Sequence, residues 1–269
     1  PTPSSAASDV YKRQQIYLLD TSNASAKLLS DGKSRNGGPL WSTDGEKIAF
    51  QSTKRNGRSN DIWIMNVTSN EEAQMVLESP DGTWWGASDW TEDDKTILVQ
   101  NYISITNSKI YLVDLETQKK QLILGKEEEP SANSALAFDK DDKGVFYITD
   151  KFSQFSQLTY HNLESGEDLI ISSEIPWDVD GFAMSEDGKR AAFVVNENGY
   201  STLYLLDPKS FKFKKVNSIP LGLIGGMQFD KDNKRLGLTI NTHQTPSDTY
   251  VLNLKRNVLS HGKLERWTY

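Results

Sequence analysis

Residues 41–50 read Trp41-Ser42-Thr43-Asp44-Gly45-Glu46-Lys47-Ile48-Ala49-Phe50, a polar turn centred on Asp44 and Gly45 that leads into a short apolar run. An Asp-Gly pair between two apolar segments is a strong short-range signal for a β-hairpin. The phrase recurs four more times, and the shared aspartates are Asp44, Asp93, Asp141, Asp187 and Asp232. Their spacings of 49, 48, 46 and 45 residues indicate an internal repeat.

A second motif follows each turn at the same period, an apolar strand that ends in Asp or Asn. Its copies are Asp61–Asn66, Lys109–Asp114, Gln157–Asn162, Thr202–Asp207 and Asp248–Asn253. A fourth strand follows, for example at Lys119–Leu124, Lys212–Asn217 and Lys263–Thr268. Four strands in 45 to 49 residues is the length of one propeller blade. The sequence therefore predicts an all-β fold, a β-propeller of four-stranded antiparallel blades, with a β-sandwich as the alternative.

The repeat divides the chain into one domain with a short tail. Residues 15–269 form the predicted propeller, and residues 1–14 are interpreted as a non-native cloning tail or a flexible tail. The blades are expected at about 37–79, 83–125, 132–173, 178–218 and 222–269, after a half blade at 15–31. We therefore expect a fragment of five and a half blades with an incomplete ring, whose uncovered strand edges favour association.

Composition excludes some partners. The 269 residues include 30 Lys and Arg against 37 Asp and Glu, a net charge of −7, which argues against nucleic acid or an anionic membrane surface as partner. There is no cysteine, so disulfides and thiolate metal sites are excluded. No apolar run reaches the roughly 18 residues of a membrane-spanning helix. The compartment stays open, with a periplasmic or secreted location favoured over the cytoplasm.

Several stretches resemble a known family. Residues 41–50 followed by 61–66 resemble the WD40-like repeats of TolB and of the propellers in serine peptidases of the prolyl oligopeptidase family. Residues 177–188 and 192–204 look like a mid-propeller blade of bacterial peptidases in that family. Residues 244–251 and 262–268 look like the blade that precedes their catalytic domain. The resemblance covers residues 15–269.

The resemblance implies a propeller that caps an α/β-hydrolase domain and restricts access to a Ser, Asp and His triad, so that peptides are favoured over folded proteins. The triad has no counterpart in this sequence, because a nucleophile elbow needs Gly-x-Ser-x-Gly. The nearest strings, Gly86–Trp90 and Gly199–Leu203, lack the second glycine. We therefore expect no catalytic residue and no cofactor in the chain itself.

Two functions stay open, and a third is disfavoured. The first is the substrate-gating propeller of a prolyl oligopeptidase-type peptidase, acting on peptides through an attached hydrolase domain. The alternative is a TolB-like propeller that binds other proteins and has no catalytic activity. A glycan-active enzyme would need paired acidic groups in one pocket, whereas the repeated aspartates are spread over five turns.

Histidines and turn aspartates give no metal site. His161 occupies a strand position, His243 and His261 are expected in loops, and none has a partner at metal-ligand spacing. The repeated aspartates belong to tight turns, where a short carboxylate accepts hydrogen bonds from backbone amides. Their expected role is therefore turn formation and not calcium binding.

Three further groups of residues are candidates for a functional role. Dipeptidyl peptidases of the family hold a substrate amino terminus with a glutamate pair that lies in a helical insertion. The sequence has two acidic runs, Glu71-Glu72 and Glu127–Glu129, but neither lies in such an insertion. Both are therefore expected to be solvated turns. Residues 54–58, Lys-Arg-Asn-Gly-Arg, are expected to form a solvated hairpin tip. The tryptophans near the first strands could line a channel, but core packing is the favoured role; they are Trp84, Trp85, Trp90 and Trp177.

Overall fold

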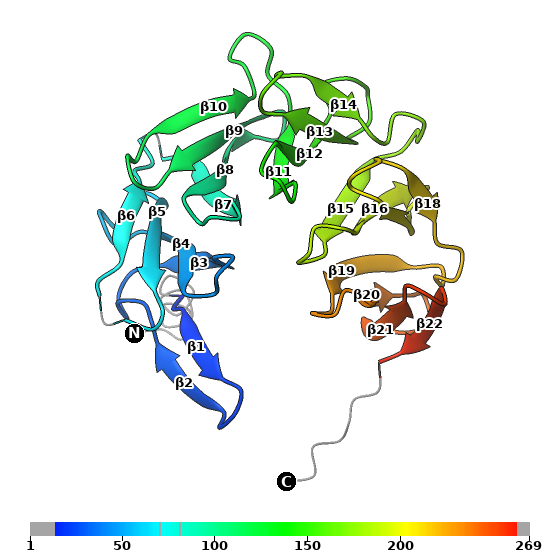
Figure 1. Ribbon diagram of the computed structural model, residues 1–269, viewed down its shortest axis with the longest axis horizontal. Helices are drawn as coiled ribbons and strands as arrows, with labels where there is room; N and C mark the ends of the chain where they lie inside the picture. Colours follow the sequence, from blue (N-terminus) through cyan, green and yellow to red (C-terminus); the bar gives the residue numbers. More distant parts are fainter. Residues whose placement is uncertain (1–13, 70, 81, 263–269) are drawn as a thin grey trace, which may run out of the picture. The chain divides into compact units, whose positions relative to one another are not determined.

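The computed structural model describes residues 14–69, 71–80 and 82–262, and these contain strands and turns without a helix (Figure 1). The strands form five four-stranded sheets and one two-stranded sheet, in which neighbours along the chain are neighbours in the sheet. Every strand pairing recorded is antiparallel. The described ranges contain no helix long and apolar enough to cross a membrane. The fold is all-β and built from β-propeller blades.

The two-stranded sheet and the first two blades precede residue 129. The two-stranded sheet is β1 (Tyr17–Asp20) and β2 (Ser25–Leu28). The next sheet is β3 (Asn36–Trp41), β4 (Lys47–Ser52), β5 (Asp61–Asn66) and β6 (Gln74–Leu77). It is followed by β7 (Trp84–Trp90), β8 (Thr96–Ser104), β9 (Asn107–Asp114) and β10 (Lys120–Leu124).

The remaining three sheets repeat the same pattern. One consists of β11 (Asn133–Phe138), β12 (Gly144–Thr149), β13 (Gln157–Asn162) and β14 (Asp168–Ile170). The next consists of β15 (Val179–Met184), β16 (Ala191–Glu197), β17 (Tyr200–Leu206) and β18 (Phe213–Lys215). The last consists of β19 (Leu223–Phe229), β20 (Arg235–Asn241), β21 (Asp248–Asn253) and β22 (Val258–His261).

One predicted strand is misplaced. The fourth strand of the last sheet is β22, which pairs with β21 from Asn253↔Val258 to Tyr250↔His261, whereas the sequence pattern placed it at 263–268. The expectation for 263–268, like that for the tail up to residue 13, lies outside the described residues. The turn after Asn253 has a left-handed residue, Asn257 (φ 54°), at the position that Gln118 and Phe211 (φ 56° each) occupy in other blades, so the fourth strand begins here close to the offset seen there.

The chain packs as two compact units, one ending at Phe138 and one beginning at Asp139. In the first unit, apolar side chains of β4 to β6 pack against those of β7 to β9; they include Ala49, Ile62, Trp85, Trp90 and Val99. In the second unit, strands β16 and β17 pack in the same way against β20 and β21, through Ala192, Leu203, Leu236, Leu238 and Leu252. Each core therefore lies between consecutive blades, as expected when one blade cannot bury its own faces.

Candidate functional site

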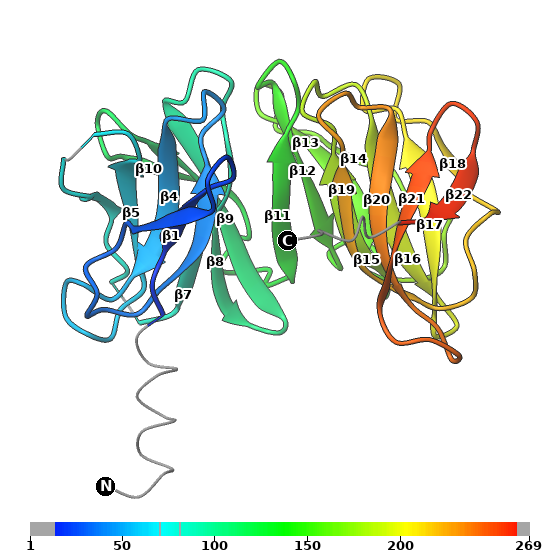
Figure 2. The ribbon, with the colours of Figure 1, turned by 90° about the horizontal axis from the view of Figure 1, so that it is seen from below.

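Each blade has two chemically different ends. We call the end with the first-to-second and third-to-fourth strand connections the turn end. We call the opposite end, with the second-to-third strand connections and the links between sheets, the loop end. Figure 2 shows the strands side-on, with these connections at their two ends. The repeat places the same strand connections at the same end of every blade. The turn end and the loop end are therefore defined within each unit separately.

Side chains hold the first-to-second strand turns in three blades by one pattern. The Oδ1 of Asp44 accepts hydrogen bonds from the Ser42 hydroxyl (2.6 Å) and the Glu46 amide (2.8 Å). The equivalent bonds to Asp93 and Asp187 come from Thr91 and Ser185 and from the amides two residues further on. The Ser42 and Glu46 bonds lower the pKa of Asp44 below its usual value. The carboxylates of Asp44, Asp93 and Asp187 thus accept hydrogen bonds within their own turns.

The other two turns use a different aspartate. In the turn that contains Asp141, the Oδ1 of Asp139 accepts the amides of Asp141 (3.1 Å) and Lys143 (2.9 Å). In the turn that contains Asp232, Asp230 accepts the Lys234 and Arg235 amides. Both acceptors occupy the repeat position that holds Ser or Thr elsewhere, so a carboxylate there replaces the hydroxyl.

Asp94 connects two blades and is a residue that the sequence analysis did not single out. Its Oδ1 accepts the Thr43 amide (2.7 Å) and its Oδ2 accepts the Asp44 amide (3.0 Å) of the preceding blade. Asp94 is buried and adopts a left-handed φ of 55°. Other repeats hold Gly45, Gly188 and Asn233 at this position, which are residues that tolerate a left-handed backbone. The sequence signal for Asp94 was therefore an aspartate at a left-handed turn position, where its carboxylate can also accept hydrogen bonds.

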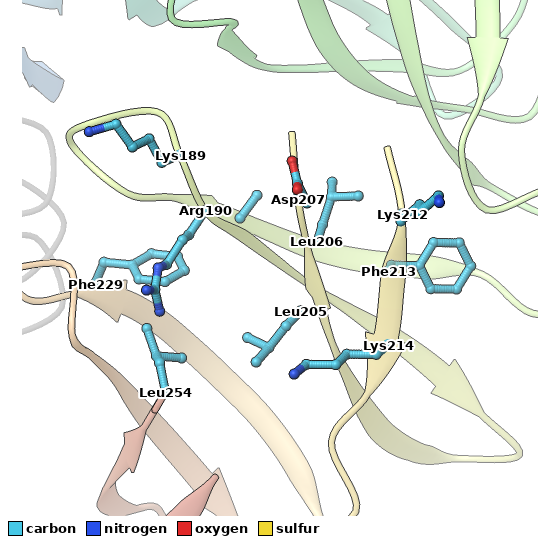
Figure 3. Close-up of a pocket in the computed structure, with 11 residues that line it drawn as sticks. Lys189, Arg190, Leu205, Leu206, Asp207, Lys212, Phe213, Lys214, Phe229 and Leu254 are labelled. Atoms are coloured by element: carbon cyan, nitrogen blue, oxygen red, sulfur yellow. The ribbon is translucent and has the colours of Figure 1, made fainter. Parts of the chain in front are cut away.

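A pocket of about 390 Å³ lies at the turn end between the β15–β18 and β19–β22 sheets (Figure 3). Its apolar lining includes Leu205 from β17, Phe229 from β19 and Leu254 after β21. Four cationic side chains surround this floor: Lys189, Arg190, Lys212 and Lys214. Figure 3 shows Arg190 extending past the Phe229 ring toward Leu254, and Lys214 extending toward Leu205. We call this the basic pocket.

The first unit contains a pocket at the equivalent repeat position, with the opposite charge balance. It has about 410 Å³ and lies between the β3–β6 and β7–β10 sheets. Lys47, Ile64 and Leu115 stand where the basic pocket has Arg190, Leu205 and Leu254. Its acidic lining residues are Glu71, Glu72, Asp94 and Glu116. We call it the acidic pocket; the blade repeat supplies the cavity, and the side chains supply the charge.

The loop end carries most of the exposed apolar surface. Of the thirteen large apolar side chains that are exposed in and between the five four-stranded sheets, among the described residues, nine lie there. In the first unit they are Trp84, Tyr102, Ile103 and Ile105, at the tip of the long β8–β9 hairpin and beside it; in the second they are Phe152, Trp177, Tyr200, Leu221 and Leu223. Trp84 pairs with Tyr102 across β7 and β8, and Ile105 is 81 % exposed. Exposed apolar surface of this kind is typical of surfaces that contact other molecules.

The histidines lie in different surroundings. His161 is buried on β13, where its Nδ1 lies 2.8 Å from Asp168 Oδ1. His243 lies in the connection between β20 and β21. The expectation of a loop for His261 was wrong, because it ends β22, contacts the Asp248 carboxylate at 3.2 Å and packs on the Tyr250 ring. Among the described residues, no three His, Asp or Glu side chains are grouped as metal ligands.

The charged segments are exposed, as expected, but several of their side chains make ion pairs. Arg55, predicted in a solvated tip, makes a bidentate ion pair with the fully buried Asp61 at 2.8 and 3.0 Å, and this raises the pKa of Arg55. Glu127 pairs with Lys109. Glu71 and Glu72 do lie in the β5–β6 turn, where Glu72 is 3.8 Å from Lys54. A local pattern could not reveal these pairs, since each partner lies on another strand or turn.

The four tryptophans with a predicted core role divide into two groups. Trp85 and Trp90 are buried in the first unit's core, as favoured from the sequence. Trp84 and Trp177 are 42 % and 38 % exposed at the loop end, so the core role was wrong for them. Neighbouring residues of a strand point to opposite faces, which is why Trp84 and Trp85 differ.

Comparison with known proteins agrees with the fold. No protein-family model matches the chain. Over 183 residues, 67% of the chain, it is 27% identical to YuxL of Bacillus subtilis, described as an uncharacterized peptidase, and it spans only 25% of that protein's length. The chain is thus similar in sequence to part of a bacterial peptidase.

Solved structures with the same fold differ in function. TolB of Acinetobacter baumannii superposes with a TM-score of 0.70 at 15% identity, over 93% of this chain and 60% of that one. Prolyl oligopeptidase B of Galerina marginata gives 0.72 at 13%, over 92% and 38%. An oligogalacturonate lyase of Vibrio parahaemolyticus gives 0.74 at 14%, over 94% and 74%. The chain is therefore made of β-propeller blades of the kind found in prolyl oligopeptidases and TolB, and its sequence is similar to that of a bacterial peptidase.

Proposed function

We propose that this chain is the propeller of a prolyl oligopeptidase-type serine peptidase, where it restricts access to a catalytic α/β-hydrolase domain. The observation that carries the proposal is the sequence similarity to the Bacillus peptidase, because the blade fold alone is shared by proteins of several functions. Peptides would be the substrates, and the chain would supply selection by size.

The two ends of the blades support this assignment. A covering domain needs an apolar contact surface, and the exposed apolar side chains gather at the loop end in both units. The outermost strand β22 runs toward the same end, since its last residue, His261, pairs with Tyr250 near the start of β21.

The experiment starts from the complete reading frame of the source DNA, expressed as one protein. We expect hydrolysis of short fluorogenic peptides, no cleavage of the same sequence placed within a folded domain, and labelling of one serine by a fluorophosphonate probe. A native stop codon directly after Tyr269, or a full-length protein that the probe does not label, would overturn the proposal. That result would leave the alternative, a TolB-like propeller that binds proteins through the loop end.

A further inference from the structure

The basic pocket concentrates positive charge in an acidic protein. The chain carries a net charge of −7, yet this pocket has four cationic side chains and one acidic residue, Asp207, among the described residues that line it. The Asp207 carboxylate already accepts the amides of Lys209 and Ser210, at 2.9 and 3.1 Å. These bonds, the Ser210 amide first, lower the pKa of Asp207. The carboxylate is thus held by its own turn.

The two cations that face the cavity have no carboxylate partner within the described ranges. The neighbouring Lys215 makes an ion pair with Glu197 at 2.8 Å, and Lys189 lies 3.6 Å from Asp187. Neither Arg190 nor Lys214 makes an ion pair with a described residue. Among the described residues, Lys189 is the only one of the four lining cations that makes an ion pair, so the pocket presents cations that an anionic ligand can neutralise.

The floor of the pocket is apolar and continuous with the core. Leu205, Phe229 and Leu254 are half-buried and pack against the apolar cluster between β16–β17 and β20–β21. The register sets Lys214 directly beside Leu205, because these residues pair across β17 and β18. A ligand that lies on this floor therefore meets an ammonium group at the edge of an apolar surface.

We propose that the basic pocket binds a small organic carboxylate with an apolar side chain, such as the C-terminal residue of a peptide. Arg190 provides a planar fork that matches the two oxygens of a carboxylate, and Lys214 adds a second positive charge. The apolar side chain would cover Leu205 and Leu254. A cavity of about 390 Å³ accommodates a ligand of one or two residues. This site goes beyond the proposed function and does not depend on it.

The acidic pocket is the internal control for this proposal. It has nearly the same volume and the same apolar positions, Ile64 and Leu115, but more acidic than basic lining residues. If the cavity of the repeat were sufficient for binding, both pockets would take the same ligand. The charge argument predicts that only the basic pocket takes the carboxylate.

The test uses N-acetyl-leucine and its neutral analogue N-acetyl-leucinamide, titrated into the 269-residue chain by isothermal calorimetry and by NMR. We expect saturable binding of the acid and binding of the amide weaker by at least about tenfold, the scale of one lost charge-assisted hydrogen bond. R190Q and K214Q should each weaken the acid by about tenfold as well. K47Q, the matched change in the acidic pocket, should leave the affinity unchanged.

Several outcomes would overturn the site. The first is the absence of saturable binding of the acid, and the second is equal binding of acid and amide. The third is equal affinity of K214Q and the original chain for the acid. The fourth is binding of inorganic phosphate as tight as that of N-acetyl-leucine, because it would show that the apolar side chain of the ligand is not required. Because Lys214 is exposed, K214Q is expected to fold, and the conservative K214R should restore most of the affinity. Unchanged urea-unfolding midpoints for the variants check that the fold is kept.

Discussion

At the scale of single residues, Asp94 shows how one side chain can perform two tasks. Its backbone has a φ of 55°, which costs energy for a residue with a Cβ. Its carboxylate accepts two backbone amides of the preceding blade, at 2.7 and 3.0 Å. Hydrogen bonds to a charged acceptor contribute about 1.5–3 kcal/mol each in net terms. The bonds therefore outweigh the strain.

This balance predicts opposite results for two glycine substitutions. D94G relieves the φ but removes both bonds, so it should lower the free energy of unfolding by about 2 kcal/mol. N233G, at the same position of the last blade, has a φ of 56° and an Oδ1 that is buried without a hydrogen-bond partner in the structure. It should be neutral or stabilising. Urea unfolding followed by tryptophan fluorescence and circular dichroism measures both, and equal effects of the two variants would contradict the assignment.

At the scale of elements, strands β12, β13 and β14 share a buried polar network. Asp168 on β14 accepts the Tyr147 hydroxyl (2.9 Å), lies 2.8 Å from His161 and is 3.5 Å from the Lys151 ammonium. Burial by itself would raise the pKa of Asp168, but the bonds from His161 and Tyr147 lower it below the usual value. The same burial, together with the Asp168 charge, raises the pKa of Tyr147.

The lowered pKa of Asp168 predicts the direction of a pH effect. An unfolded aspartate titrates near pH 3.9. Because the folded-state pKa is lower, the stabilisation is complete above the pKa of the unfolded aspartate. It is lost as the pH falls through the folded-state pKa. D168N should therefore destabilise the protein most at pH 7 and progressively less as the pH falls below about 3.9. Unfolding free energies of both proteins across this range test it; a constant difference would refute the linkage.

The blades could be predicted from the sequence because their signals are local. The turn at Asp44 bonds atoms two residues away on either side, and the strand Asp61–Asn66 pairs with β4, the strand directly before it in the chain. The basic pocket could not be predicted in this way. Arg190 and Leu254 come from different sheets, and whether Lys214 or Lys215 faces the next blade depends on a strand register that changes with a shift of one residue.

At the scale of the whole molecule, the difference between the two blade ends governs behaviour in solution. The turn ends carry the repeated turns with their charged side chains. The loop end of the first unit instead exposes four apolar side chains, Trp84, Tyr102, Ile103 and Ile105. Large exposed apolar patches favour association when their partner is absent. The isolated chain should therefore associate through the loop end.

The corresponding prediction concerns oligomeric state. The double variant I103S/I105S should reduce concentration-dependent association in sedimentation velocity without changing the unfolding midpoint, because both side chains are exposed. The matched control is L122S/L169S, which removes two exposed leucines from fourth strands. If the control reduces association as strongly as the hairpin variant does, the loop end is not the contact surface.

The bonds of Asp94 also have a consequence for the time course of synthesis. Thr43 leaves the ribosome 51 residues before the carboxylate that binds its amide. At about 5–20 residues per second, this delay is roughly 3 to 10 s. During it, the first blade exposes the apolar face that the second blade will cover, so this is the interval in which a nascent chain is open to chaperones and proteases. Slowing translation before Val113, the last residue of the second blade in the shared core, should lengthen this period of vulnerability.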